Sequence, residues 1–207
     1  QRPGEPLVLR QAGVLMSVGD TLVTGFSGRL VGIHPGNGSV RWEAPIATPR
    51  GINDVERLVD LVAGVSRQGP SVCVRAFQSS VGCVDATRGT VQWTRPAQSG
   101  QGLTGDDRAL YGAESDGRLV AWRRSDGERL WTDDRLRFRG LGTPLLAGRS
   151  LIVGDAGGLV HVLSREDASP LNRVATDGSA IVNAPVLAGE TLVVATRAGG
   201  VFAFRPE

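Results

Sequence analysis

Lysine is absent from the 207-residue sequence, and all 23 basic residues are arginines. Without lysine the chain has no side chain for Schiff-base chemistry and no phosphate-binding loop of the lysine-containing type. No apolar run approaches the ~20 residues that a membrane-spanning helix requires. The opening residues, Gln1 to Pro6, are typical of a cut end or a linker and not of an export signal. The sequence therefore argues against amine chemistry and a helical membrane span, and gives no direct signal for a compartment.

Clustered positive charge is also missing. The chain has 23 basic and 21 acidic residues, a formal net charge of +2, and only 5% aromatic residues. A nucleic-acid groove needs basic side chains gathered to neutralise phosphates, often with aromatics between them. No such run occurs, so we predict no nucleic-acid partner.

Residues that carry catalysis or bind metals are few and scattered. His34 and His161 are the only histidines, and no group of histidine, cysteine and aspartate has metal-ligand spacing. No G-x-S-x-G nucleophile motif occurs. Residues 100–105 match G-x-G-x-x-G, but a strand follows them, and a pyrophosphate site needs a helix N-terminus there. The chain is therefore predicted to be a binding module and not an enzyme, with no cofactor and no metal.

The two cysteines, Cys73 and Cys83, lie ten residues apart on successive predicted strands. Each fits a small, buried apolar position. The pair also fits a cross-strand disulfide in an oxidising compartment. The sequence leaves both interpretations open.

An internal repeat is the strongest signal in the chain. Five copies share an anchor residue, usually glycine, followed two positions later by leucine or valine. The anchors are Gly28, Ser79, Gly117, Gly157 and Gly199, separated by 51, 38, 40 and 42 residues. Fourteen residues after the first four anchors stand Trp42, Trp93, Trp131 and Leu171. Matches at several fixed offsets indicate a repeat architecture.

Each copy combines short β-branched runs with turn dipeptides such as Asn37-Gly38 and Asp126-Gly127. A period near 40 with three or four strands per copy is typical of a β-propeller blade. One small sheet cannot bury both of its faces, so it must stack on neighbours. We expect the tryptophans to fill the space between blades. His161, at a repeat position that other copies fill with small residues, is expected to be structural.

The predicted fold is all-β, a single partial β-propeller domain of about five blades over residues 1–207. The last copy lacks the residues for its outer strand, because the sequence ends soon after Phe204. Closed propellers hide their sheet edges. We therefore expect the chain to be a portion of a larger propeller, with the missing strand supplied from outside it.

An insertion accounts for the long first interval and covers roughly residues 49–69. Its apolar residues fit one or two helical turns, but they equally fit an exposed loop that leads into the next blade. We favour the exposed loop. Insertions in repeat arrays fall on one face and often carry binding.

Four stretches, in order along the chain, resemble the C-terminal part of the BamB family of propeller lipoproteins in the outer-membrane β-barrel assembly machinery. Leu7–Arg10 resembles the family's L-x-L-R segment, and Asp54–Asp60 resembles its acidic-I-acidic-R-L-x-D loop. Thr143–Asp155 resembles its S-P-V-L-x-x-G-x-L-V-V-G-D strand pair, and Phe202–Arg205 resembles its final strand. The two loop segments make the resemblance more specific than the repeats alone.

The resemblance implies an eight-bladed, non-catalytic propeller at the periplasmic face of the outer membrane, held by a lipid anchor on a cysteine that lies near the family's N-terminus. It implies binding to the POTRA domains of BamA, with unfolded outer-membrane proteins as further partners. The family's second loop acid is Val62 here. Asp60 either contacts the partner or pairs with a nearby arginine and holds the loops together. The matching candidate residues are Leu7, Leu9, Arg10 and Asp60, with Arg57 beside them.

Two alternatives belong to other functional classes. A fragment of a quinoprotein dehydrogenase, which depends on pyrroloquinoline quinone, would use similar repeats but needs a cofactor pocket with calcium. That class is associated with vicinal cysteines, whereas nine residues separate Cys73 from Cys83. The other alternative is a propeller sensor domain cut from a larger signalling protein.

Overall fold

The computed structural model describes residues 13–49, 52–53 and 58–205. These residues form 19 β-strands and no helix, which confirms the predicted all-β class and leaves no helix there that could cross a membrane. The chain divides into two compact units. Unit 1 comprises Gln1–Gly102 and Arg124–Gly127, and unit 2 comprises Leu103–Arg123 and Glu128–Glu207.

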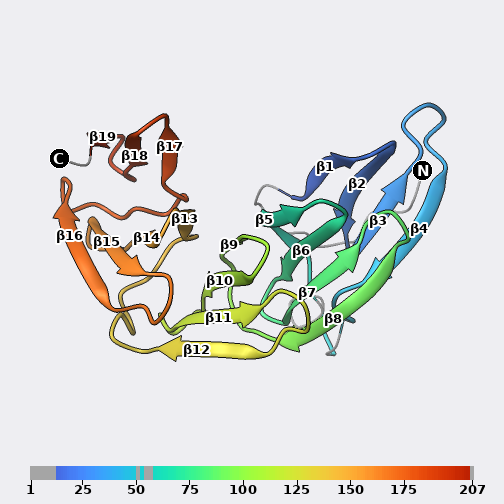
Figure 1. The fold of residues 1–207 in the computed structure, drawn as a ribbon, viewed down its shortest axis with the longest axis horizontal. Helices are drawn as coiled ribbons and strands as arrows, with labels where there is room; N and C mark the ends of the chain where they lie inside the picture. Colours follow the sequence, from blue (N-terminus) through green and yellow to red (C-terminus); the bar gives the residue numbers. More distant parts are fainter. Residues whose placement is uncertain (1–12, 50–51, 54–57, 206–207) are drawn as a thin grey trace. The chain divides into compact units, whose positions relative to one another are not determined.

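Unit 1 holds two four-stranded antiparallel sheets in which neighbouring strands follow sequence order. Figure 1 shows each as a meander of strands joined by short turns. The first contains β1 (Leu15–Val18), β2 (Thr21–Phe26), β3 (Arg29–Ile33) and β4 (Val40–Pro45). The second contains β5 (Leu61–Gln68), β6 (Ser71–Ala76), β7 (Ser80–Asp85) and β8 (Thr90–Pro96).

Unit 2 repeats this meander in two four-stranded sheets and a three-stranded sheet. The first contains β9 (Leu103–Gly105), β10 (Ala109–Ala113), β11 (Leu119–Arg123) and β12 (Arg129–Asp133). The second contains β13 (Leu145–Ala147), β14 (Ser150–Gly154), β15 (Leu159–Ser164) and β16 (Pro170–Ala175). The third contains β17 (Val186–Ala188), β18 (Thr191–Ala195) and β19 (Val201–Phe204), and the described residues add no fourth strand to it.

Apolar runs at both faces of a strand let it sit between two other sheets. Successive side chains of a strand point to opposite faces. In β14, Leu151 and Val153 enter one apolar cluster, shared with β10 and β11, while Ile152 enters a second cluster shared with β18. The sequence therefore has a continuous apolar run here, where a half-exposed sheet would show alternation. In unit 1 a single cluster joins the sheets of β1–β4 and β5–β8 in the same way.

Two of the three predicted tryptophans, Trp42 and Trp93, pack their indole rings against a glycine in a turn of the next sheet. A Cβ on Gly89 would lie 2.4 Å from Cγ of Trp42, and a Cβ on Gly127 would lie 2.4 Å from Cε3 of Trp93. The Trp93 Nε1–H also donates to the carbonyl of Arg124 at 2.7 Å. The expectation that these tryptophans pack agrees with this geometry.

The fourth repeat is shifted by one residue from its expected position. β15 and β16 pair Val162 with Asn172, and the register slips between Val162 and Leu163. In the preceding sheet, β11 and β12 pair Ala121 with Trp131, and the register slips in the same way between Ala121 and Trp122. Asn172, and not Leu171, therefore takes the tryptophan position, and the slip leaves Leu171 58% exposed. The left-handed backbone seen at the anchors Gly28, Gly117 and Gly199 falls in this repeat on Gly158 (φ 76°) and not on Gly157.

The insertion between β4 and β5 is described only in part. Residues 52–53 form a bend, Ile52 is fully exposed, and regular pairing begins only at Leu61. The described residues 52–53 and 58–60 contain no helical turn, and residues 54–57 lie outside the described chain, so the form of the whole insertion stays a prediction.

Candidate functional site

Asp60, the predicted binding residue within the described part of the chain, lies at one end of the sheets in unit 1. In a four-stranded meander, the turn after the second strand and the connection after the fourth lie at the same end. We call this end the loop rim of unit 1. Its described parts are the β2–β3 turn (residues 26–29), residues 46–49, 52–53 and 58–60 of the β4–β5 connection, and the β6–β7 turn (residues 77–79).

The β4–β5 connection is fastened to the β2–β3 turn through Gly28. The Gly28 carbonyl accepts hydrogen bonds from the backbone N–H groups of Ile46 (2.9 Å) and Ala47 (3.0 Å). Gly28 has a φ of +74°, and a Cβ there would lie 2.7 Å from the Ala47 oxygen and 2.9 Å from Cγ2 of Val59. Val59 is buried in the core of unit 1. The connection is therefore anchored at both ends while Ile52 between them stands in solvent.

Asp60 is the predicted site residue that falls within the described chain. It is half-buried immediately before β5, and its carbonyl accepts a hydrogen bond from the Phe77 N–H at 2.9 Å. This bond ties the end of the connection to the β6–β7 turn. Leu7, Leu9, Arg10 and Arg57 lie outside the described residues, so their role in partner binding stays a prediction.

Unit 2 contains a pocket that sequence reasoning did not single out. Its volume is about 420 Å³, and its walls come from the β12–β13 connection on one side and from β15 and β16 on the other. Charged and apolar groups share the lining. The lining residues are Asp133, Arg135, Leu136, Arg139, His161, Leu163, Ala168, Pro170, Leu171, Asn172 and Arg173.

Asp155 binds two side chains that line this pocket, Arg139 and His161. Its fully buried carboxylate accepts from Arg139 Nε at 2.6 Å and from His161 Nε2 at 2.9 Å. Because an ionised carboxylate only accepts, His161 donates from Nε2. Burial alone would raise the pKa of Asp155, but the hydrogen bonds it accepts outweigh burial, that from His161 foremost, and hold the pKa below its ordinary value of 3.8.

The β12–β13 connection also presents an aromatic side chain to solvent. Phe138 is 80% exposed and has a left-handed backbone, with φ 61°. Its N–H donates to the Asp116 carbonyl at 2.9 Å, which fixes this conformation. The Arg137 guanidinium lies 4.7 Å from the centre of the Phe138 ring. Phe138 therefore adds exposed apolar surface to the β12–β13 connection and is not part of a core.

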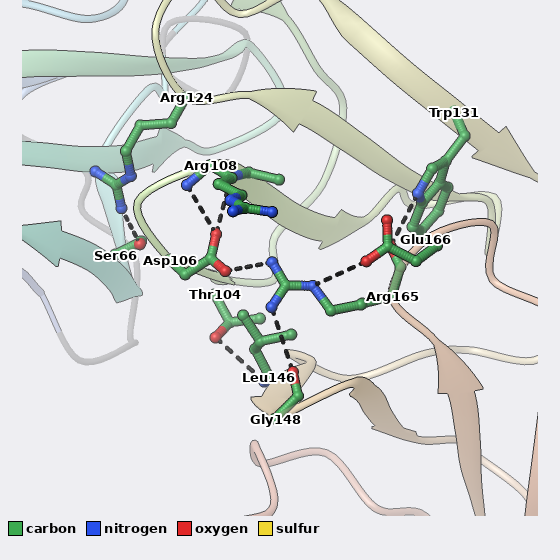
Figure 2. Close-up of polar contacts among 11 residues, drawn as sticks. Ser66, Thr104, Asp106, Arg108, Arg124, Trp131, Leu146, Gly148, Arg165 and Glu166 are labelled. Atoms are coloured by element: carbon green, nitrogen blue, oxygen red, sulfur yellow. Dashed lines mark hydrogen bonds and ion pairs between the residues drawn. The ribbon is translucent and has the colours of Figure 1, made fainter.

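Arg165 links the turns of two neighbouring sheets in unit 2, as Figure 2 shows. Its guanidinium forms an ion pair with Asp106 and donates to the Gly148 carbonyl at 3.3 Å. Its own carbonyl accepts from Trp131 Nε1 at 3.1 Å. The side chains of Arg165 and Asp106 are both largely buried, so we interpret this cluster as a structural contact that stabilises the fold.

The two cysteines form a disulfide in unit 1, which decides between the two interpretations of the sequence. Cys73 in β6 stands directly opposite Cys83 in β7, and both are fully buried. The buried Arg124 donates to Cys73 Sγ at 3.1 Å and to the hydroxyl of Ser66, the latter visible in Figure 2.

Metal binding finds no support in the described part of the chain, where no three histidine, cysteine or acidic side chains converge as ligands. Asp155 and His161 are two such groups, but their third partner is the Arg139 cation. The pocket is therefore suited to hydrogen bonding with an anion and not to holding a cation.

Four-stranded meanders that repeat every 40 residues or so, and seat tryptophans against the turns of the next sheet, define a β-propeller. Comparison with solved structures gives the same fold. BamB from Moraxella catarrhalis aligns with a TM-score of 0.88 and 24% identity, covering 99% of this chain and 61% of that one. A computationally designed protein, Ika8, aligns with a TM-score of 0.71 over 93% of this chain.

Sequence comparison then gives the family. The family model described as outer membrane protein assembly factor BamB matches residues 1–133. BamB of Burkholderia pseudomallei is 40% identical over 97% of this chain, and BamB of Bordetella pertussis is 34% identical over 99%. The chain belongs to the BamB family. It spans about half the length of these two relatives, 53% and 54% respectively.

Proposed function

We propose that this chain is part of a non-catalytic scaffold in outer membrane protein assembly, which binds the POTRA domains of BamA and supports insertion of β-barrel proteins. The observation that carries the proposal is the 40% identity to a protein named outer membrane protein assembly factor BamB, which extends over 97% of the chain. A propeller supplies a rigid frame whose loops present a partner-binding surface. In this proposal the whole protein is eight-bladed and is held by a lipid anchor on the periplasmic side of the outer membrane.

The loop rim of unit 1 is the proposed BamA-binding surface. Leu7 and Leu9 would present apolar side chains, and Arg10 would donate to a carboxylate or to backbone carbonyls. Asp60 supports this assignment because it lies at the loop rim, where its backbone carbonyl accepts a hydrogen bond from the Phe77 N–H. The exposed Ile52 adds apolar surface to that end.

Binding of immobilised POTRA domains by the full chain tests the proposal. We expect Leu9→Ala combined with Arg10→Ala to weaken binding by about tenfold or more, since interface anchors each contribute on the order of 1 kcal/mol or more. The matched control is Val40→Ala combined with Arg88→Gln, which alters an exposed valine and an exposed arginine at the opposite end of the sheets from the loop rim. Both double variants should keep the wild-type circular dichroism spectrum.

Equal binding by the wild type and the Leu9/Arg10 variant would remove the loop rim from the interface. Failure of the wild type itself to bind POTRA domains would overturn the proposed partner. The dehydrogenase alternative makes a separate prediction, namely saturable binding of pyrroloquinoline quinone in the presence of calcium, and that result would favour it instead.

A further inference from the structure

The pocket of unit 2 lies in a different part of the chain from the loop rim of unit 1. It is about 420 Å³ in volume, and its lining includes three arginines on two separate segments. Arg135 and Arg139 come from the β12–β13 connection, and Arg173 comes from β16. A pocket of this size matches a few amino-acid residues and not a folded domain.

The pocket carries one uncompensated positive charge. Arg135 pairs with Asp133, and Arg139 pairs with Asp155. Arg173 is exposed and makes no ion pair with the rest of the described chain. Among the arginines of the pocket and their acidic partners, three guanidiniums face two carboxylates. This balance suits a single negative charge better than the double charge of a phosphate group.

Asp155 binds only one of the three guanidinium nitrogens of Arg139, so the other two can donate to a ligand. The carboxylate takes only the Nε–H of Arg139, at 2.6 Å, and the two terminal nitrogens of that guanidinium have no acceptor in the described residues. The same buried carboxylate holds His161 Nε2 at 2.9 Å. Two parallel N–H groups on a fixed guanidinium match the two oxygens of a carboxylate.

The rest of the wall is apolar. Leu136 and Leu163 lie beside the charged groups, and Pro170 and Leu171 line the β16 side. Leu171 is 58% exposed, because the register slip in β16 turns it outward. A ligand that fits both parts must carry a carboxylate next to an apolar side chain.

We propose that this pocket binds a peptide segment that places a carboxylate against Arg139 and Arg173 and an adjacent apolar side chain against Leu136 and Leu171. The carboxylate is either the C-terminal group of the peptide or an aspartate or glutamate side chain. This inference does not rest on the proposed binding of BamA, since it concerns other residues in the other unit.

Titration of the full chain with small peptides tests the inference. The probes are N-acetyl-Leu-Ala-Leu with a free carboxylate, the same tripeptide as its amide, N-acetyl-Leu-Asp-Leu amide, and inorganic phosphate. The readout is the imidazole NMR signals, since the chain has only His34 and His161. We expect a carboxylate peptide to shift the His161 signal saturably, with Kd below about 1 mM, and to leave the signal of His34, which lies in unit 1, unchanged.

The variant Arg173→Gln should weaken this binding by about tenfold, because one charge-assisted hydrogen bond is lost. Arg173 is exposed, so the variant keeps the fold. The matched control, Arg149→Gln, changes another exposed arginine of unit 2 outside the pocket and should bind within about twofold of wild type.

Whichever carboxylate peptide binds identifies the source of the carboxylate. Equal binding of the fully amidated Leu-Ala-Leu peptide would overturn the proposal, as would a response to phosphate alone. The absence of any His161 shift at 10 mM peptide, about ten times the expected Kd limit, would also overturn it.

Discussion

Trp93 and Gly127 are in contact so close that no side chain fits between them. A Cβ on Gly127 would stand 2.4 Å from Cε3 of the indole, and Gly127 also has a left-handed φ of +70°. Arg95 holds the same turn by donating to the Gly127 carbonyl at 3.2 Å. The glycine is therefore required for two reasons, backbone conformation and space, and the two can be separated by mutation.

Gly127→Ala should destabilise the chain by about 2–4 kcal/mol, the sum of left-handed backbone strain and forced displacement of Trp93. Gly38→Ala is the matched control, since Gly38 has a φ of +72° but no atom within 4 Å of its Cβ position. It should cost about 1 kcal/mol. Urea unfolding followed by tryptophan fluorescence measures both. Equal losses would show that Trp93 yields freely and that the turn makes no steric demand.

The tryptophan positions were predictable because they recur at a fixed distance from the anchors, and a bulky residue repeated at blade spacing has few uses other than packing. The fourth repeat was harder to predict, because Gly157 and Gly158 are adjacent and spacing alone does not choose between them. The structure places the left-handed φ on Gly158. This one-residue difference moves Asn172 into the tryptophan position and His161 to the face that lines the pocket.

Removing the disulfide with Cys73→Ala and Cys83→Ala together should lower the free energy of unfolding by about 2–3 kcal/mol, as expected for a cross-link that closes a ten-residue loop. Dithiothreitol should shift the urea midpoint of the wild type and leave that of the double variant unchanged. Two free thiols in the denatured, unreduced wild type would contradict the disulfide directly.

Arg165→Gln should lower the free energy of unfolding by about 1.5–3 kcal/mol, because it removes the charge-assisted hydrogen bond to Asp106 at a largely buried position. Arg123→Gln is the comparison, since the Arg123–Glu128 pair is exposed and such pairs contribute about 0–1 kcal/mol. Thermal unfolding should show a drop of about 3–12 °C for the first variant, at 2–4 °C per kcal/mol. An equal drop for both would mean that Arg165 does not link the two turns.

The pocket of unit 2 shows where sequence reasoning stops. Arg139, Asp155 and His161 are separated by 16 and 6 residues, and no motif joins them. They meet because the β12–β13 connection folds back onto the β14–β15 turn, a contact set by packing and not by local pattern. Asp155 could have been noticed as a charged residue directly after an apolar strand run. Its two partners could not have been assigned without the fold.

Asp155 gives a prediction about pH. Its pKa is lower in the folded chain than its ordinary value of 3.8, so the folded state favours the ionised form. The resulting stability is present above the pKa of the unfolded chain and is lost as the pH falls through the folded pKa. Asp155→Asn should therefore cost about 3 kcal/mol at pH 7, where it leaves Arg139 without its buried partner.

That cost should shrink as the pH falls from about 5 toward 2, because the wild type then loses the same charge by protonation. Urea midpoints for both proteins at pH 7, 5, 4 and 3 measure the difference. Asp20→Asn is the control for a general acid effect, since Asp20 also has a lowered pKa, caused first by its hydrogen bond from Arg41, but its side chain is 82% exposed. Its effect on stability should be smaller at every pH. A difference between wild type and Asp155→Asn that stays constant from pH 7 to pH 3 would mean that the Asp155 charge does not stabilise the folded chain.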